Sequence, residues 1–272
     1  MRKYKFAFFC FGLLFILANH STAQQSKKIT CIGNVIDEQG QPVPGAKVTA
    51  YEMYSDGIAG NVFLKHAGGI TTEKDGAFTF TTEPKPERGT FLDGYIVAVK
   101  PDLAIGWAVW SMREDAELNI ELGKPEKLEG IIVDEAGKPI VSADVRANIY
   151  RTVKTSGGKE EREWLPGIAP LQELGVQTDT QGKFNFNNIP IEVGVDLLVT
   201  APGKAITYTY QSDISESAFK AGQTDIKVVL PAEARIEGKI IDPDTGKGLA
   251  GVKFAVVYTA SGLFYYRFVC IN

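Results

Sequence analysis

The chain has 272 residues, of which 44% are hydrophobic and 23% are charged, and its formal net charge is −4. A chain of this length and composition can bury the cores of roughly two domains, each of about 100–200 residues. Its acidic balance argues against a nucleic-acid-binding protein, which needs a basic face, and against binding to an anionic membrane surface.

Residues 1–23 have the organisation of a secretory signal peptide. A basic head precedes an apolar run from Phe6 to Ala18, and small residues stand at Ser21 and Ala23, before the expected cleavage site. The run is shorter than the ~20 residues of a membrane-spanning helix, and a membrane anchor is the alternative interpretation. We expect an exported chain, in the periplasm, at the cell surface or secreted, with no membrane span after cleavage.

One sequence pattern then occurs three times. A glycine is followed four residues later by an aspartate, and a second glycine closes a short polar turn before a strand of alternating apolar residues. Aspartate at the start of such a turn and glycine at its end match the chemistry of a type I turn. The period-two alternation predicts a half-buried strand. The first glycines are Gly33, Gly130 and Gly238, the aspartates are Asp37, Asp134 and Asp242, and the turn glycines are Gly40, Gly137 and Gly246.

The first two copies share further blocks. Thr71–Phe80 reads TTEKDGAFTF and Gln177–Phe186 reads QTDTQGKFNF, and each predicts a hairpin that leads into a strand with two alternating phenylalanines. A unit of about 100 residues with seven short strands is typical of an antiparallel β-sandwich. We therefore predict an all-β chain of tandem seven-stranded antiparallel β-sandwiches, joined into a fairly stiff rod. Two repeats are complete (27–124 and 125–233) and the third is truncated (234–272).

The stretch GNVIDEQGQPVPGAKVTAYE with its downstream DGAFTF resembles the carboxypeptidase regulatory-like domain, a transthyretin-like β-sandwich. It is also similar to the related module at the N-terminus of many outer-membrane receptors of the Bacteroidetes type. The resemblance covers essentially all of the mature chain and implies an accessory module, because the same module occurs in very different parent proteins. Two positions depart from the family pattern without affecting the fold, Gln181 before Gly182 in the second copy and Gly248 in the third.

The residue types that catalysis requires are scarce. After the expected cleavage the chain has one histidine, His66, whereas a zinc peptidase needs two histidine ligands and a carboxylate. A serine–histidine–aspartate triad would have to use the same His66, with no nucleophile elbow nearby. The sequence DPDTG at Asp242 opens like a calcium loop but lacks the later ligands, so the turn interpretation is preferred. We expect neither an enzyme nor a cofactor or metal.

Two cysteines, Cys31 and Cys270, remain after cleavage. Exported proteins can form disulfides, but two cysteines in the first and third repeats are not a disulfide framework. Cys31 is interpreted as a small apolar residue on a strand, and a bridge to Cys270 is the alternative.

Aromatic residues are the remaining candidates for contact with a ligand or partner. Trp164 lies in an extra charged segment of the second repeat, residues 152–175, where an exposed indole could stack on a sugar ring or on a partner surface. Trp107 and Trp110 are three residues apart, so we expect one in the core and the other exposed. Tyr208 and Tyr210 fall on one face of a strand. Packing of these rings against the sandwiches is the alternative interpretation.

The third copy contains two strands and no hairpin block. Two strands cannot close a sandwich, so we expect a fragment of a longer chain; the alternative is a half-domain that another chain completes. The expected function is an exported, non-catalytic binding or spacer module that contacts a protein or glycan at the cell surface. The alternatives are the N-terminal accessory region of a larger exported enzyme or outer-membrane transporter, and a weak carbohydrate-binding module.

Overall fold

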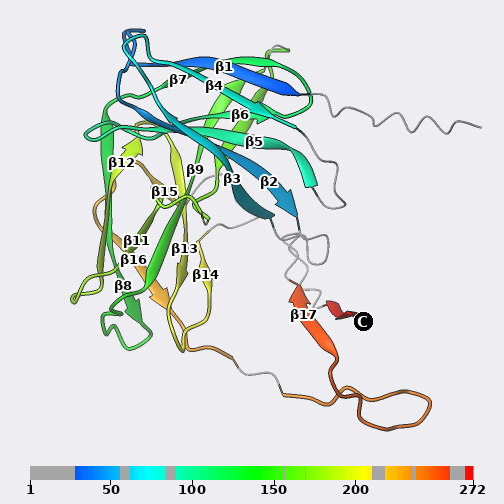
Figure 1. Ribbon diagram of the computed structural model, residues 1–272. Coiled ribbons are helices and arrows are strands. Elements are labelled where there is room, and N and C mark those ends of the chain that lie inside the picture. Colours follow the sequence, from blue (N-terminus) through cyan, green and yellow to red (C-terminus); the bar gives the residue numbers. More distant parts are fainter. Residues whose placement is uncertain are drawn as a thin grey trace, which may run out of the picture.

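The computed structural model describes residues 28–55, 62–83, 90–155, 157–168, 170–209, 218–234, 237–257 and 267–271. All regular elements of these residues are β-strands (Figure 1), and none of them forms a helix that could cross a membrane. The strands are β1 (Ile29–Ile36), β2 (Lys47–Ser55), β3 (Val62–Thr71), β4 (Ala77–Thr82), β5 (Thr90–Val99), β6 (Gly106–Ser111), β7 (Ala116–Glu121), β8 (Pro125–Asp134), β9 (Asp144–Lys154), β10 (Glu160–Leu165), β11 (Gly175–Gln177), β12 (Lys183–Pro190), β13 (Gly194–Thr200), β14 (Thr207–Tyr208), β15 (Phe219–Lys220), β16 (Ile226–Leu230), β17 (Lys253–Val257) and β18 (Arg267–Ile271).

The first two repeats fold into sandwiches with the same topology. In the first, the sheet β4-β1-β7 faces the sheet β3-β2-β5-β6. In the second, β12-β8-β16 faces β10-β9-β13-β14, with β11 added beside β9 and β15 beside β13. The prediction of an all-β chain with tandem β-sandwiches is confirmed.

The sequence predicts purely antiparallel sandwiches, and this part of the prediction is wrong. The first strand of each sandwich runs antiparallel to the hairpin strand but parallel to the last strand, in the pairs β1–β7 and β8–β16. The last strand reaches this sheet from the opposite one rather than through a tight hairpin. Its direction is therefore not fixed by a turn, and a parallel neighbour is allowed.

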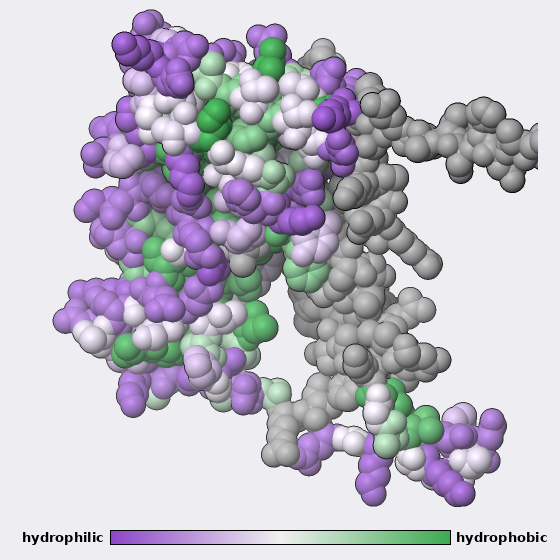
Figure 2. Space-filling view, viewed as in Figure 1, coloured by the Kyte–Doolittle hydropathy of each residue, from purple (hydrophilic) through white to green (hydrophobic). Residues whose placement is uncertain are grey.

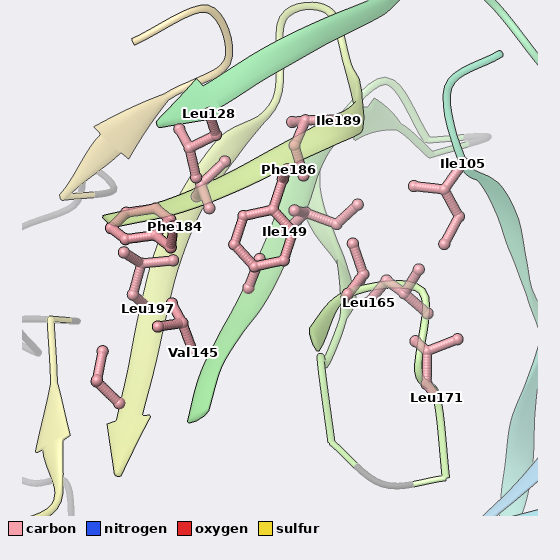
Figure 3. Packing of buried hydrophobic residues seen from close by; sticks show 14 of the residues in the cluster. Ile105, Leu128, Val145, Ile149, Leu165, Leu171, Phe184, Phe186, Ile189 and Leu197 are labelled. Atoms are coloured by element: carbon pink, nitrogen blue, oxygen red, sulfur yellow. The ribbon is translucent and has the colours of Figure 1, made fainter. Parts of the chain in front are cut away.

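The inward-pointing residues of the two facing sheets form the core of each sandwich. Figure 3 shows this for the second sandwich, where Leu128, Phe184 and Phe186 from one sheet pack with Val145 and Leu197 from the other. All five side chains are at most 3% exposed. The predicted alternation of the phenylalanine strand is thus confirmed.

The repeated aspartates and glycines form turns. The Asp37 carboxylate accepts hydrogen bonds from the N–H groups two and four residues later, at 2.9 and 2.8 Å. Asp134 accepts the equivalent pair at 3.0 and 2.9 Å, and these backbone bonds lower the pKa of its carboxyl. Asp242 accepts two such bonds at 2.8 and 3.1 Å. The turn glycines have positive φ, namely 73° at Gly40, 79° at Gly137 and 67° at Gly246. The turn interpretation is confirmed in all three copies.

The glycine that opens each complete copy is required by packing. A Cβ atom on Gly33 would lie 1.8 Å from the Leu118 carbonyl oxygen of β7 and 2.6 Å from Cζ of Phe78. At Gly130 the corresponding distances are 2.4 Å to a β16 carbonyl oxygen and 2.7 Å to Phe184. The phenylalanine of the hairpin strand therefore occupies the space of the missing side chain.

Cys31 is a core residue, as expected. Its side chain is 0% exposed in the first sandwich, it forms no disulfide, and burial raises the pKa of its thiol to about 11. Cys270 lies on β18, in a part of the chain where only the backbone is described.

We expect Cys31 to be inert toward thiol reagents in the folded protein. At pH 8 a thiol with this pKa is about one-thousandth thiolate, and the thiolate is the reactive form. In a variant whose only cysteine is Cys31, a colorimetric thiol assay should show no reaction over an hour and full reaction in denaturant. Rapid labelling of the native protein would contradict this placement.

Candidate functional site

The outer face of the sheet β3-β2-β5-β6 is buried against the second sandwich. Tyr51, Tyr95 and Trp107 on this face belong to one hydrophobic cluster with the core of the second sandwich, whereas Trp110 points into the first sandwich's own core. Both tryptophans are 1% exposed, so the prediction that one of them is exposed is wrong. The second sandwich covers the face that an isolated domain would leave in water. We call this contact the inter-sandwich joint.

The extra segment of the second repeat, residues 152–175, contributes to the burial of this sheet face. Part of this segment is the strand β10, which pairs with β9. Leu165 at the end of β10 is fully buried in the shared cluster, and so are Leu171 and Leu174 in the chain that follows. Figure 3 shows Leu165 and Leu171 on the side of the second sandwich that faces Ile105 of the first. The extra segment therefore fills the space between the two sandwiches with buried leucine side chains.

Arg151 ties the two sandwiches together. Its Nη2 donates to the Trp107 carbonyl oxygen at 2.8 Å, and its guanidinium lies 4.3 Å from the centre of the Trp107 ring. Glu163 holds the guanidinium from the neighbouring strand, accepting from Nε at 3.1 Å. Burial, followed by the negative charge of Glu163, raises the pKa of the Tyr95 hydroxyl on the first sandwich. A paired arginine stacked on a tryptophan is a directional contact, which fixes an angle as well as a distance.

A second group of contacts lies at the Lys47 end of the joint. The Ile105 N–H donates to the Asn188 carbonyl oxygen at 2.9 Å, and the Asn188 amide donates to the Glu173 carbonyl oxygen at 2.9 Å. Burial, followed by the Glu173 charge, raises the pKa of Tyr51 to about 12. The ion pair between Lys47 and Glu173, at 3.7 Å, has an exposed lysine and contributes little.

The sandwiches are therefore fixed together, but not end to end. In Figure 1 the strands of the first sandwich run across the top of the molecule and those of the second run down from it. One end of the second sandwich abuts a sheet face of the first. The straight head-to-tail rod that the short linker suggests is replaced by a bent, close-packed pair.

A cleft of about 470 Å³ lies beside the joint. Its walls carry Glu38, Glu121 and Glu192 together with Lys124 and Arg151. The carboxylate of Glu38 accepts the Lys124 backbone N–H at 2.9 Å. Among the residues that the structure describes, no three histidine, cysteine, aspartate or glutamate side chains are grouped to hold a metal ion. The mixed charge is that of a solvated crevice between two domains.

The four aromatic candidates among the described residues do not come together. Trp164 is half-buried on β10, with its ring centre 4.5 Å from that of Tyr150 on the adjacent strand. Tyr208 is 46% exposed on β14, and Tyr210 lies outside the described residues. Trp164 and Tyr208 share the outer face of one sheet, but their neighbours on β9 are four residues apart, about 13 Å. They do not form a continuous stacking platform.

Between these two rings lies a buried carboxyl group that the sequence analysis did not single out. Asp196 on β13 is 0% exposed, accepts the Ala218 N–H at 3.0 Å through Oδ1, and has no hydrogen-bond partner at Oδ2. Burial raises the pKa of this carboxyl, and Arg162 opposes the shift. Its place inside an apolar strand could have marked it, because a charged residue is rarely fully buried.

We expect Asp196→Asn to stabilise the protein at neutral pH. A raised pKa in the folded state means that folding favours the protonated form, so the stability present at low pH is lost as the pH rises through the folded pKa. The neutral amide escapes this loss. The gain should be small at pH 4 and reach about 1 kcal/mol, roughly 2–4 °C in Tm, at pH 8. Thermal melts of both proteins from pH 4 to 8 measure the difference.

Asp196→Ala is the matched control. It leaves the Ala218 N–H without its acceptor and should lower Tm at every pH. If the difference in Tm between Asp196→Asn and the parent chain stayed constant across this pH range, the raised pKa of the Asp196 carboxyl would be contradicted.

The chain matches no protein-family model and no curated protein sequence. Among solved structures it is similar to the shaft pilin SpaA from Lactobacillus rhamnosus GG, with 10% identity, a TM-score of 0.28, and coverage of 77% of this chain and 99% of the pilin. A streptococcal ancillary pilin gives 13% identity, a TM-score of 0.29, and coverage of 78% and 64%. The Bacillus anthracis TIE protein has 17% identity and a TM-score of 0.27, and the match covers 76% of this chain and 34% of that protein. With TM-scores below 0.5 we draw no functional inference from these similarities.

Proposed function

We propose that this chain is an exported, non-catalytic structural module whose first two sandwiches act as one rigid spacer. One observation carries the proposal. A single hydrophobic cluster contains Tyr95 and Trp107 of the first sandwich together with Leu165 and Leu171 of the second. Domains that move freely are joined by smaller and more polar contacts.

The polar groups of the joint support the same role. Arg151 is engaged at once by a carbonyl, a ring and the Glu163 carboxylate, so it is not free to bind a ligand. The repeated Gly–Asp–Gly turn and the phenylalanine hairpin support membership of the carboxypeptidase regulatory-like group, and the signal-peptide pattern of residues 1–23 supports export. In this proposal the spacer holds a protein or glycan partner, or the rest of a larger exported protein, at a fixed distance and angle.

Single-molecule pulling tests the spacer function. Residues 28–234 are held by handles at both ends and extended in an optical trap. A rigid spacer should show no lengthening step before a sandwich unfolds, because the joint must break together with the fold. A reversible step at low force, with both sandwiches still intact, would show that the domains undock freely and would contradict the proposal.

A further inference from the structure

The buried Asp196 carboxyl lies where the short strand β15 is attached to the second sandwich. β15 makes only two residue pairs with β13, and the next positions in this antiparallel register are Asp196 and Ala218. Here the Ala218 N–H donates to Oδ1 of Asp196 at 3.0 Å. The aspartate side chain therefore holds the chain at the point where it enters β15.

The other contacts of β15 are few. Phe219 is partly buried against the hydrophobic cluster, and the Ala221 N–H donates to the Val193 carbonyl oxygen at 3.2 Å. Ala218 and Lys220 are exposed, and Figure 2 shows hydrophilic residues over much of the visible surface of the second sandwich, below the first. A strand with so few contacts opens at a lower free-energy cost than the whole domain.

The surroundings of the Asp196 carboxyl suit its neutral form. Its Oδ2 has no hydrogen-bond partner among the described residues, and the side chain is 0% exposed. Its cross-strand neighbour on β9 is the neutral Asn148, whose Oδ1 already accepts the Gly167 N–H at 3.0 Å. Burial is the main cause of the raised pKa of the Asp196 carboxyl, and the Ala218 hydrogen bond and the Arg162 charge oppose it. A buried carboxylate without a full set of partners is unfavourable, whereas the neutral acid is tolerated.

The charged and titratable side chains around Asp196 leave Oδ2 unpaired. Among the described residues of this sheet face they are Arg146, Tyr150, Arg162, Tyr208 and Lys220. Arg162 is the cation that acts on the carboxyl, and its guanidinium lies 4.6 Å from the centre of the Tyr150 ring. Arg146 donates to the Asp144 carboxylate at 2.9 Å, and Lys220 is exposed. None of these groups donates a hydrogen bond to Oδ2.

We propose that Asp196 makes β15 a pH-sensitive switch, which is closed while the carboxyl is neutral and is released from β13 when the carboxyl ionises. Release brings the carboxylate into water, where its pKa returns to the ordinary value of about 3.9. The closed state has the higher pKa, so release becomes more favourable as the pH rises from the ordinary value to the raised one, and then levels off. This inference does not rest on the proposed spacer function, because release of β15 leaves both sandwiches folded.

Hydrogen exchange of the Ala221 amide measures the release. The exchange rate is followed by nuclear magnetic resonance on the mature chain, 24–272, from pH 4 to 8, and is divided by the rate of a free amide to give the opening equilibrium constant. We expect this constant to be about fivefold larger at pH 8 than at pH 4 in the parent chain. In Asp196→Asn it should not change with pH, because the amide cannot ionise and still offers an oxygen to the Ala218 N–H.

Two controls separate release of β15 from other kinds of opening. Phe219→Ser weakens the contact of β15 without altering the carboxyl, so it should raise the opening constant by the same factor at every pH. Low concentrations of denaturant should leave the Ala221 rate unchanged but accelerate exchange of the Ile132 amide in the core strand β8, since only global unfolding exposes much new surface. The same pH dependence in Asp196→Asn and the parent chain would overturn the proposal. So would equal acceleration of Ala221 and Ile132 by denaturant.

Discussion

Trp107→Ala should split the unfolding of the first two sandwiches into two transitions. The ring is 1% exposed at the centre of the inter-sandwich joint and stacks under Arg151. Its removal opens a cavity in the shared core, and truncation of a buried tryptophan costs about 3–5 kcal/mol. Because the loss falls on the contact between domains, it reduces their cooperativity as well as their stability. Denaturant unfolding of residues 28–234, followed by fluorescence and far-ultraviolet circular dichroism, measures both.

Two variants control for effects that do not belong to the joint. Val109→Ala alters the same strand on the same face at a position that is 41% exposed, and it should change stability by less than about 0.5 kcal/mol. Trp107→Phe keeps an aromatic ring beneath Arg151 and removes an indole N–H that has no hydrogen-bond partner. It should preserve a single transition. If Trp107→Ala unfolded in one transition with the stability of Val109→Ala, the joint would not couple the sandwiches.

Gly33→Ala should be the most damaging conservative substitution in the first sandwich. The new methyl group would lie 1.8 Å from the Leu118 carbonyl oxygen and 2.6 Å from Phe78, both held by paired strands. Real contacts of this kind stay beyond about 3 Å, so β7 or the ring must shift. We expect the free energy of unfolding to fall by about 3 kcal/mol, at the upper end of the range for overpacked cores. Thermal and denaturant unfolding measure it.

Gly238→Ala is the matched control at the equivalent position of the third copy. Neither glycine has a positive φ, so the two substitutions differ in the space around the new methyl group rather than in backbone strain. With nothing within 4 Å, Gly238→Ala should change stability by less than about 0.5 kcal/mol. Equal effects at both positions would mean that glycine is required by the backbone and not by the phenylalanine above it.

The local patterns of the sequence predict the fold well. An aspartate and a glycine at fixed spacing determine a turn whether or not the rest of a sandwich is present, which is why Asp242 forms the same turn as Asp37. Alternation likewise identifies the inward residues, such as Phe184 and Phe186, because each strand carries its own two faces. These features depend on neighbours along the chain, so a repeat in the sequence becomes a repeat in the structure.

The joint depends on contacts that no local pattern specifies. Alternation shows that Trp107 and Trp110 point to opposite faces, but not that a second domain covers one of them. The run Ile105–Trp110 contains no polar side chain, which is typical of a strand that is buried on both faces. This feature could have indicated that a second domain buries the outer face of the strand. Arg151 and Glu163 carry no comparable signal, because their role arises only when the two sandwiches meet.

The central claim is that the two sandwiches form one rigid body. Spin labels at Thr79 on β4 and Asn185 on β12, both exposed and one on each sandwich, report the distance between the domains when Cys270 is replaced by serine. Pulsed electron resonance should give one narrow distance distribution for the parent chain and a broad one for Trp107→Ala. A broad distribution in the parent chain would contradict the claim.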